Sequence, residues 1–355
     1  MPTLANLSES VRQSAYNAGF DLAGIAPAAD SPELEYFPRW VEAGHAGEMK
    51  YLEARDEAGN LKRGSLRHTA PWARSVIVCA MNYNASPPYS TEFHDAGCGW
   101  ISRYAWGGED YHDSILRRLR QVESELQQAV SQPLTTRCYV DTGPLVERVY
   151  AKYAGIGWIG KNTCIINQQK GSWLFLGVIL TSLELIADLP APDRCGSCTR
   201  CLDACPTHAF TAPHQLDATK CISYLTIEKR GAIPEDLRDG MGRHVFGCDI
   251  CQDVCPWNRK APATSAAEFQ PRAELVNPAL DWLAELSVES FRAHFRHTPL
   301  SRAKRSGLRR NAVVAMGNSS QRKFLPSLER LARDEDPVVA ETARWAHLKL
   351  TEPSS

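Results

Sequence analysis

Eight cysteines between residues 195 and 255 constrain the fold of this chain more than any other feature. Four follow the spacing Cys195-x2-Cys198-x2-Cys201-x3-Cys205, and Pro206 comes directly after the last. A second group, Cys248-x2-Cys251-x3-Cys255, also ends in a Cys-Pro pair, and Cys221 stands alone between the groups. Glycines and prolines interrupt this stretch, so we expect short elements folded around bound metal rather than one long helix or strand.

This spacing is typical of proteins that hold two [4Fe–4S] clusters, in which three closely spaced thiolates bind one cluster and the fourth cysteine reaches the other. Because each x3-Cys-Pro arm leaves its own loop, the spacing predicts crossed ligand sets. We assign one cluster to Cys195, Cys198, Cys201 and Cys255. The second cluster is assigned to Cys205, Cys221, Cys248 and Cys251. Two adjacent clusters indicate a path for single electrons toward a reaction elsewhere in the chain.

Two structural zinc sites built from CxxC pairs are the alternative. A zinc site has no use for the third cysteine of the first group or for two Cys-Pro arms, which favours iron–sulfur clusters. The remaining cysteines lack such spacing, and we interpret them as small buried apolar residues: Cys79, Cys98, Cys138 and Cys164.

The segment before the cysteines, residues 1–187, predicts an α+β domain with a mixed sheet and covering helices. β-rich runs are expected at residues 75–80, 135–140, 163–167 and 173–181. A one-sided apolar stripe predicts a helix over residues 111–130 that Asp110 caps, and a helix is also expected over residues 7–18.

The rest of the chain predicts two further units. Residues 188–193 indicate a linker, and residues 188–262 are expected to form a ferredoxin-like two-cluster domain. Residues 279–355 are expected to form a helical domain of HEAT-like repeats, with short amphipathic helices over 309–317, 324–333 and 337–350.

The overall charge excludes a protein that coats nucleic acid with a uniformly basic surface, because 40 Lys and Arg face 41 Asp and Glu. The longest uncharged apolar-rich run, residues 171–183, is shorter than the ~20 residues needed to span a bilayer. Residues 1–6 show no signal-peptide pattern. We therefore expect a cytoplasmic protein without a membrane partner, whose cysteines are reduced.

Two shorter motifs imitate cofactor sites. Gly155-x-Gly157-x-x-Gly160 follows a predicted helix over 145–154 and precedes a strand, the reverse of the order in a dinucleotide-binding loop, so we interpret it as a turn. Asp110-x-His112 resembles the start of a cobalt-ligating motif, but residue 115 is Ile where that motif has Gly. We expect this pair to cap a helix, so this motif supplies no histidine ligand for a cobalt.

Four motifs together resemble the epoxyqueuosine reductase family over about residues 8–350: residues 140–144 (VDTGP), residues 154–164 (AGIGWIGKNTC), residues 195–207 with the first cysteines, and Arg103-x-x-Trp106-Gly107-x-x-Asp110-Tyr111-His112. The resemblance implies reduction of epoxyqueuosine to queuosine at the wobble position of tRNA, the last step of queuosine biosynthesis. It implies an α+β cobalamin-binding catalytic domain, cobalamin and two [4Fe–4S] clusters. The implied partners are the anticodon stem-loop of tRNA bearing epoxyqueuosine and an external electron donor. We expect a monomer.

The resemblance assigns the role of proton donor to Asp141. The local pattern agrees, because Pro144 suits a first helical turn, Gly143 the cap before it, and Asp141 the carboxyl end of a strand. A general acid must hold its proton near neutral pH, so we expect Asp141 to lie against an apolar surface. The alternative is an Asx-turn carboxylate that only satisfies backbone N–H groups.

The resemblance also implies cobalamin contacts, with Cys248 and Asp249 acting through their backbone. These residues are Arg63, Ser102, Asp141, Lys161, Asn162, Ile165, Ser172, Ser223, Cys248 and Asp249. Some relatives carry Cys at the position of Ser102, so this chain offers no thiol there.

A basic stretch near the C-terminus predicts the RNA-binding face. Between residues 291 and 324 there are nine Lys and Arg and no acid, whereas a solvated helix surface usually carries acids as well. We expect phosphate contacts from Arg302, Lys304, Arg305, Arg309 and Arg310. Lys229 and Arg230 form a smaller candidate near the second cluster.

Two other functions stay open on the sequence. A cobalamin-dependent reductive dehalogenase shares the cofactors, but the basic tail argues against it. A non-enzymatic iron–sulfur electron carrier that docks on RNA or a protein is the second, and stoichiometric cobalamin binding would exclude it.

Overall fold

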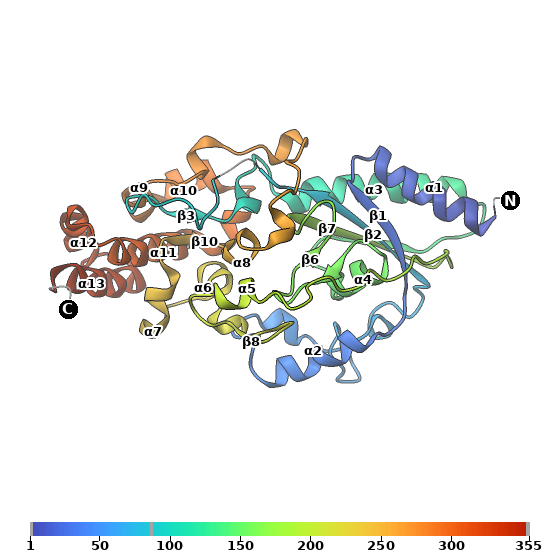
Figure 1. Cartoon of the computed structure of the whole chain (residues 1–355), viewed down its shortest axis with the longest axis horizontal. Coiled ribbons are helices and arrows are strands. Elements are labelled where there is room, and N and C mark those ends of the chain that lie inside the picture. The colour runs from blue at the N-terminus through green and yellow to red at the C-terminus, as the bar shows by residue number, and fades with distance from the viewer. Residues whose placement is uncertain (1–2, 86–87, 353–355) are drawn as a thin grey trace.

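The computed structural model describes residues 3–85 and 88–352 and shows an α+β protein (Figure 1). Its N-terminal half contains a four-stranded sheet in the order β1-β2-β7-β4. The strands are β1 (Leu22–Pro27), β2 (Ser75–Asn82), β4 (Thr136–Tyr139) and β7 (Leu174–Thr181). All neighbouring pairs in this sheet are antiparallel. The predicted mixed sheet is therefore wrong, because β-rich runs locate strands but do not reveal their directions.

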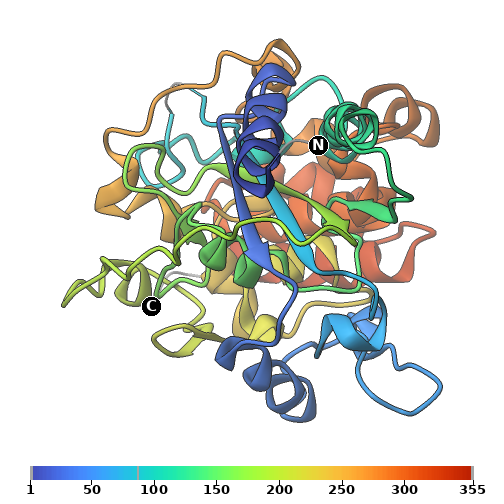
Figure 2. The ribbon, with the colours of Figure 1, turned by 90° about the vertical axis from the view of Figure 1, so that its right-hand side faces the viewer.

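Helices cover both faces of this sheet. Strand β2 is buried along its whole length, and its side chains alternate between two apolar layers. Ile77 and Cys79 pack with α1 and α3, whereas Val76 and Val78 pack with α4. Figure 2 shows α1 and α3 together on one side of the sheet. The helices are α1 (Leu4–Asn17), α2 (Pro32–Glu42), α3 (Tyr111–Ala129) and α4 (Glu147–Tyr153).

The ends of two helices test the predicted capping. Asp110 caps α3, and its side chain accepts a hydrogen bond from the backbone N–H of His112, as predicted. Helix α4 starts at Glu147, so the predicted helical turn at Pro144 is wrong. Gly155 and Gly157 lie in the turn between α4 and β5 (Trp158–Ile159), as predicted, and Gly155 has a φ of +71° there; Gly160 follows β5. Strand β5 pairs with β6 (Ile165–Ile166).

The cysteine-rich middle of the chain consists of short elements. Helices α5 and α8 each contain a predicted cluster cysteine and lie against each other. Each stops before a Cys-Pro pair, because proline cannot continue a helix. Strand β10 pairs in parallel with β3 of the N-terminal half. The elements are β3 (Trp100–Ile101), α5 (Arg200–Asp203), β8 (Phe210–Ala212), β9 (Gln215–Leu216), α6 (Ile222–Ile227), α7 (Glu235–Arg238), β10 (His244–Phe246) and α8 (Ile250–Asp253).

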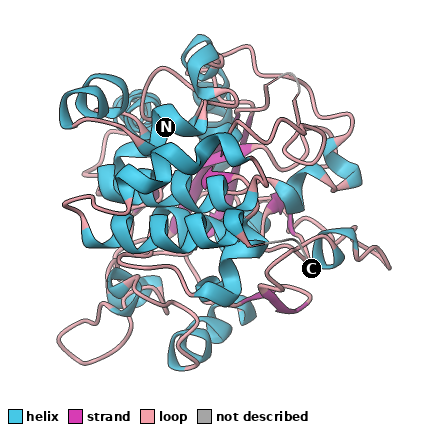
Figure 3. Cartoon of the chain, turned by 90° about the vertical axis from the view of Figure 1, so that its left-hand side faces the viewer, coloured by secondary structure: helices cyan, strands magenta, loops and turns pink. Residues whose placement is uncertain are grey.

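The C-terminal segment is helical, and Figure 3 shows its helices stacked side by side. They are α9 (Leu280–Ala284), α10 (Val288–Phe295), α11 (Lys304–Asn318), α12 (Leu325–Leu331) and α13 (Pro337–Thr351). Asp336 caps α13 by accepting from the backbone N–H groups of Val338 and Val339. The predicted helices are present, and their assignment to HEAT-type repeats stays a prediction.

Helix α11 lies at the centre of this segment. The prediction of an amphipathic helix over residues 309–317 is wrong, because every residue from Leu308 to Gly317 is buried. Helices α6, α9 and α13 and strand β10 pack around it and leave none of these ten residues exposed. A Cβ atom at Gly317 would lie 2.7 Å from Trp345, so this glycine permits the close crossing with α13.

One hydrophobic core joins all three predicted units. It contains Trp100 from the first, Phe246 from the second and Leu308 from the third. The predicted linker is hydrogen-bonded to the N-terminal half. Asp188 accepts hydrogen bonds from the Ile25 N–H and the Arg12 guanidinium, both over 2.8 Å. The three units therefore pack as parts of one structure, and their exact boundaries stay predictions. In the parts of the chain that the structure covers, no helix combines the length and apolar character needed to cross a membrane.

Candidate active site

Asp141 lies two residues beyond the end of β4, as the sequence predicted. Its backbone has a φ of +57°, in the left-handed region that non-glycine residues rarely adopt. Its side chain is 70% exposed, so the protein itself does not supply the apolar burial that we expected. Within the described part of the chain, no backbone N–H donates to this carboxylate, which argues against the Asx-turn alternative.

Residues at the start of α3 hold the Asp141 carboxylate. The Tyr111 hydroxyl donates a hydrogen bond to Asp141 Oδ2 over 3.1 Å, and His112 Nε2 lies 3.9 Å from the same oxygen. The Tyr111 ring stacks on Phe175 of β7, with ring centres 4.3 Å apart and planes 4° apart. Burial, reinforced by the Asp141 charge, raises the pKa of Tyr111 well above its ordinary value, so its hydroxyl remains a donor.

His112 connects Asp141 to a second carboxylate. His112 Nδ1 lies 2.7 Å from Asp110 Oδ1. Burial lowers the pKa of His112, but the hydrogen bond and the charge of Asp110 outweigh this effect, and the net shift is upward. The protonated imidazole is therefore favoured between the two carboxylates.

Glu147, at the start of α4, is a second carboxyl group near Asp141. Its Oε1 atom is buried and has no hydrogen-bond partner among the described residues. Burial, followed by the negative charge of Asp141, raises the pKa of Glu147 to about 7. The sequence analysis missed this residue, because a single Glu in a helix carries no spacing signal.

Tyr51 brings a predicted cofactor residue and a predicted RNA residue to the same place. Its side chain is 45% exposed. The guanidinium groups of Arg63 and Arg302 lie 5.5 and 5.3 Å from the centre of its ring. Burial raises the pKa of Tyr51, and the charges of Glu228 and Asp141 add to this rise. Arg63 and Arg302 therefore flank one aromatic ring, and the charge of Asp141 acts on its hydroxyl.

The four cysteines of the first predicted cluster line one cavity of about 380 Å³, together with Lys161, Asn162, Ile166, Arg194, Arg200, Pro256 and Trp257. The Trp158 indole N–H donates to Cys195 Sγ over 3.4 Å. Among the described residues, no three His, Cys, Asp or Glu side chains form a site for a single metal ion. The shared cavity brings Cys255 together with Cys195, Cys198 and Cys201, which is the grouping that the spacing predicted.

The four cysteines of the second predicted cluster also lie near one another. Burial raises the pKa of Cys248, and the neighbouring thiols of Cys221 and Cys205 add to this rise. The pKa of Cys251 is raised by its hydrogen bond with Cys164, by burial, and by Cys248 and Cys221. The Ala209 N–H donates to Cys205 Sγ over 3.4 Å. Of the four other cysteines, only Cys79 is fully buried as predicted, and Cys164 instead contacts a cluster cysteine.

Ser102 and Asp249 form a buried polar pair beside the second cluster. Asp249 is 1% exposed and accepts hydrogen bonds from the Ser102 hydroxyl, the Trp100 indole N–H and the Arg103 backbone N–H. A Cβ atom at Gly247 would lie 2.4 Å from Ser102 Cβ and 3.5 Å from Tyr104. Tyr104 packs edge-on against Tyr111. This aromatic pair connects the loop of Cys248 to Asp141.

Other predicted cofactor residues attach the N-terminal half to the cluster loops. Lys161 Nζ donates to the carbonyls of Gly196 and Cys198, and Asn162 Nδ2 donates to the carbonyl of Cys251. Ser172 Oγ accepts from Gln252 and Asn258. Ile165 is buried, and Ser223 is half-buried beside Cys221. The polar atoms of Lys161, Asn162 and Ser172 are therefore occupied by protein groups.

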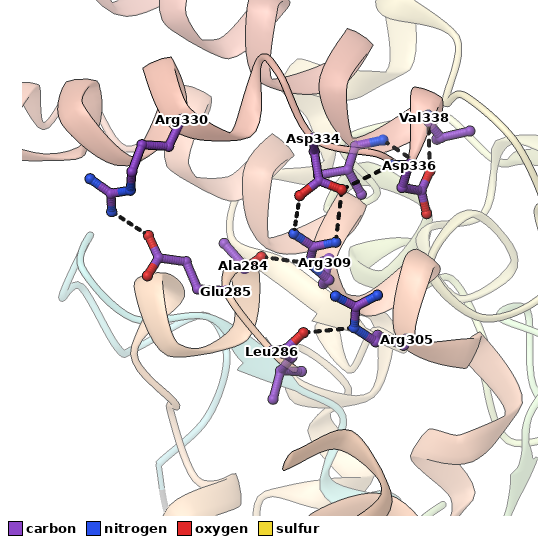
Figure 4. Close-up of polar contacts among 10 residues, drawn as sticks. Ala284, Glu285, Leu286, Arg305, Arg309, Arg330, Asp334, Asp336 and Val338 are labelled. Carbon is purple, nitrogen blue, oxygen red and sulfur yellow. Dashed lines mark hydrogen bonds and ion pairs between the residues drawn. The ribbon is translucent and has the colours of Figure 1, made fainter. Parts of the chain in front are cut away.

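Arg309 and Arg310 do not form the predicted RNA-binding face. They are 4% and 2% exposed. Arg309 makes two hydrogen bonds to the Asp334 carboxylate and one to the carbonyl of Ala284 (Figure 4). Arg310 donates to the carbonyls of Leu225, Lys229 and Gly231. The prediction of phosphate contacts is wrong for both, because their guanidinium groups are buried and hydrogen-bonded to groups inside the protein.

The other predicted RNA contacts differ in accessibility. Arg302 is paired with Glu228 and remains 51% exposed, and Lys304 is exposed at the first residue of α11, with a φ of +62°. Lys229 pairs with Glu48, and the Arg230 guanidinium donates to the carbonyls of Arg302 and Ala303. Arg305 is half-buried and donates to the carbonyl of Leu286.

Two family models match the chain and define its class. Residues 194–258 match the 4Fe-4S double cluster binding domain, and residues 63–142 match the family described as epoxyqueuosine reductase QueG, DUF1730. The chain is thus an iron–sulfur protein with a double-cluster module.

Relatives identify the family more closely. The epoxyqueuosine reductase of Pseudomonas aeruginosa is 40% identical over 351 residues, covering 97% of this chain and 95% of the relative. That of Synechocystis sp. is 42% identical over 294 residues, covering 81% and 98%. A crystal structure of epoxyqueuosine reductase with an epoxyqueuosine-modified tRNA-Tyr stem loop superimposes with a TM-score of 0.86 at 33% identity, covering 99% and 92%. The chain belongs to the epoxyqueuosine reductase family, as the sequence resemblance predicted.

Proposed function

We propose that this chain reduces the epoxide of epoxyqueuosine in tRNA to the alkene of queuosine, with two [4Fe–4S] clusters and cobalamin as cofactors. The reaction consumes two electrons and two protons and releases the epoxide oxygen as water. One observation carries the proposal: the exposed Asp141 carboxylate accepts a hydrogen bond from Tyr111, Tyr111 packs against Tyr104, and Tyr104 lies against the loop of the cluster cysteine Cys248. A proton donor and an electron path therefore converge on one face. Family membership favours this function over the dehalogenase and the simple electron carrier.

The residues on this face fit a large planar cofactor. Tyr51 offers an exposed ring, Arg63 a cation beside it, and Glu147 a buried oxygen without a partner among the described residues. We expect the Cys248–Asp249 backbone and Ser102 to border the same space. When bound, cobalamin supplies two-electron transfer to an electrophilic carbon. Lys161, Asn162 and Ser172 support the site by holding the cluster loops in place.

Asp141 donates the proton that the departing epoxide oxygen needs. Its exposed carboxylate can reach a substrate, while Tyr111 keeps it in one orientation. The imidazolium of His112, 3.9 Å away, is placed to return a proton to Asp141 after each turnover.

The RNA approaches over the rim formed by Arg302, Lys304 and Arg63, which surrounds Tyr51. Phosphate contacts from this rim position the stem-loop, and the wobble base leaves the stack to reach Asp141. Arg230 and the helices α11–α13, as a HEAT-like tail, hold the rim in place. The enzyme acts as a monomer and receives its electrons from an external donor.

The decisive experiment compares the parental holoenzyme with Asp141→Asn on an epoxyqueuosine-containing stem-loop. We expect the variant to keep its clusters and cobalamin by visible spectrum and metal content, and to lose turnover by roughly 10²-fold or more. Nucleoside mass spectrometry measures the product. Near-normal turnover would remove Asp141 from the mechanism, and no queuosine from the parent would reject the function itself.

A second experiment tests the rim. The affinity of the parental protein for the stem-loop should fall with rising salt, and the double variant Arg302→Ala, Lys304→Ala should lower the slope of log K against log salt by about 1–2. Arg120→Ala on the exposed face of α3 serves as the control, because it removes one exposed charge that does not belong to the rim. An unchanged slope in the double variant would exclude the rim as the RNA contact.

A further inference from the structure

The opening above the first cluster has a basic border. Arg194 and Arg200 line the 380 Å³ cavity together with the cluster cysteines, and both side chains are exposed. Neither forms an ion pair or a side-chain hydrogen bond with any described residue. Asp193, next to Arg194, accepts from the Cys195 N–H and faces His214 at 3.8 Å. Asp203, three residues after Arg200, accepts from the Thr199 hydroxyl over 2.8 Å. Two arginines beside a metal-binding cavity thus present unneutralised positive charge to solvent.

This contrasts with most cations elsewhere in the protein. Arg302, Lys229 and Arg309 each pair with a carboxylate. Lys161 lines the same cavity but uses its ammonium group on the carbonyls of Gly196 and Cys198. Lys161 therefore maintains the loop, while Arg194 and Arg200 keep their donors free for another molecule.

The two cluster sites differ in their surroundings. The second site lies beside the buried Ser102–Asp249 pair, next to the Tyr104–Tyr111 contact that leads to Asp141. The first site opens between Arg194, Arg200 and Trp257. Electrons must therefore enter at the first site and leave from the second to reach the reaction.

We propose that the surface around Arg194 and Arg200 is the docking site for a small acidic protein that carries single electrons. This inference rests on the proposed function, which requires two electrons per epoxide. Each docking event passes one electron from the reduced carrier to the first cluster, which changes from the 2+ to the 1+ state while the carrier is oxidised by one electron. The positive charge of Arg194 and Arg200 attracts an acidic partner and speeds its association, and salt weakens both effects. Two docking events supply one turnover.

The test uses the reconstituted holoenzyme and a reduced flavodoxin, an acidic flavin protein, as the probe. The double variant Arg194→Glu, Arg200→Glu should slow reduction of the clusters by flavodoxin at least about tenfold at low salt, followed as bleaching of their visible absorption. It should also weaken binding of oxidised flavodoxin in a calorimetric titration. The double variant Arg194→Gln, Arg200→Gln should give an intermediate loss. Arg74→Glu, Arg120→Glu reverses two exposed charges on the N-terminal half and should leave both readings unchanged.

A cationic reductant separates docking from damage to the cluster. Methyl viologen radical should reduce the Arg194→Glu, Arg200→Glu variant at least as fast as the parent, because added negative charge attracts it. Equal slowing with both reductants, or flavodoxin rates and affinity equal to those of the parent, would overturn the docking site. Cluster reduction is measured without RNA, so a failure of epoxide reduction would count against the proposed function and leave this test intact.

Discussion

The Tyr111 hydroxyl donates a hydrogen bond to Asp141 Oδ2 over 3.1 Å, and the Tyr111 ring lies flat on Phe175. The hydroxyl is thus presented to Asp141 by a rigid part of the sheet. Because Asp141 is exposed and has a left-handed backbone, this bond is what orients its carboxylate.

Tyr111→Phe should therefore reduce kcat about tenfold with little change in KM, because the ring stays stacked while the carboxylate loses its orientation. Single-turnover and steady-state assays on the modified stem-loop measure the two constants. Tyr16→Phe, on an exposed residue of α1, is the matched control. A loss confined to KM would show that Tyr111 binds substrate instead of positioning Asp141.

Glu147 should make stability depend on pH. Its pKa is raised to about 7 in the folded protein from an ordinary 4.5, so the folded state keeps a proton that the unfolded chain releases between these values. The free energy of unfolding should fall as pH rises through this window and level off above pH 7. Between about pH 5 and 8, Glu147 should lower the free energy of unfolding of the parental protein by roughly 2 kcal/mol. The Glu147→Gln variant should not show this decrease.

Anaerobic chemical denaturation of the holoprotein at several pH values measures this effect. Glu57→Gln, in an exposed turn, should keep the parental pH dependence. If the free energy of unfolding changed with pH in the same way in the parent and in Glu147→Gln, Glu147 would not retain its proton in the folded state.

Arg309→Ala should destabilise the C-terminal helices by about 3 kcal/mol, because it leaves Asp334 and the carbonyl of Ala284 without their partner inside the protein. Arg330→Ala breaks the neighbouring exposed pair with Glu285 (Figure 4) and should cost less than about 1 kcal/mol. Thermal unfolding compares the two. Weaker stem-loop binding by Arg309→Ala at unchanged stability would restore its predicted RNA role.

Cys221→Ser should reduce the iron content from about eight to about four per chain, because it removes one ligand of the second cluster only. Cys98→Ser alters a half-buried cysteine outside both sets and should leave the iron content unchanged. Metal analysis after anaerobic reconstitution gives the ratio. Retention of all iron in Cys221→Ser would assign a different residue to the second cluster.

Features that depend on near neighbours in the chain were predictable. The cysteine spacing predicted the crossed sets, because the cysteine of each x3-Cys-Pro arm leaves its own loop and cannot join its near neighbours. Asp110 was predicted as a cap, since a cap acts on N–H groups two or three residues away. Tyr51 was missed because one of its partners, Arg302, is distant in sequence, and Glu147 was missed because a single Glu in a helix carries no spacing signal.

The sequence by itself predicted which cysteines lie together, and it determined the positions of the main strands and helices and the family. Only the tertiary structure decided which charges are available. Nine basic residues without an acid predicted one continuous face, yet Arg309 and Arg310 turn inward while Arg302 and Lys304 remain outside. The reason is that a guanidinium group is buried only where carboxylates and carbonyls converge on it. For Arg309 these come from Asp334 and Ala284, and for Arg310 from residues 225–231, so their meeting depends on how the helices pack around α11.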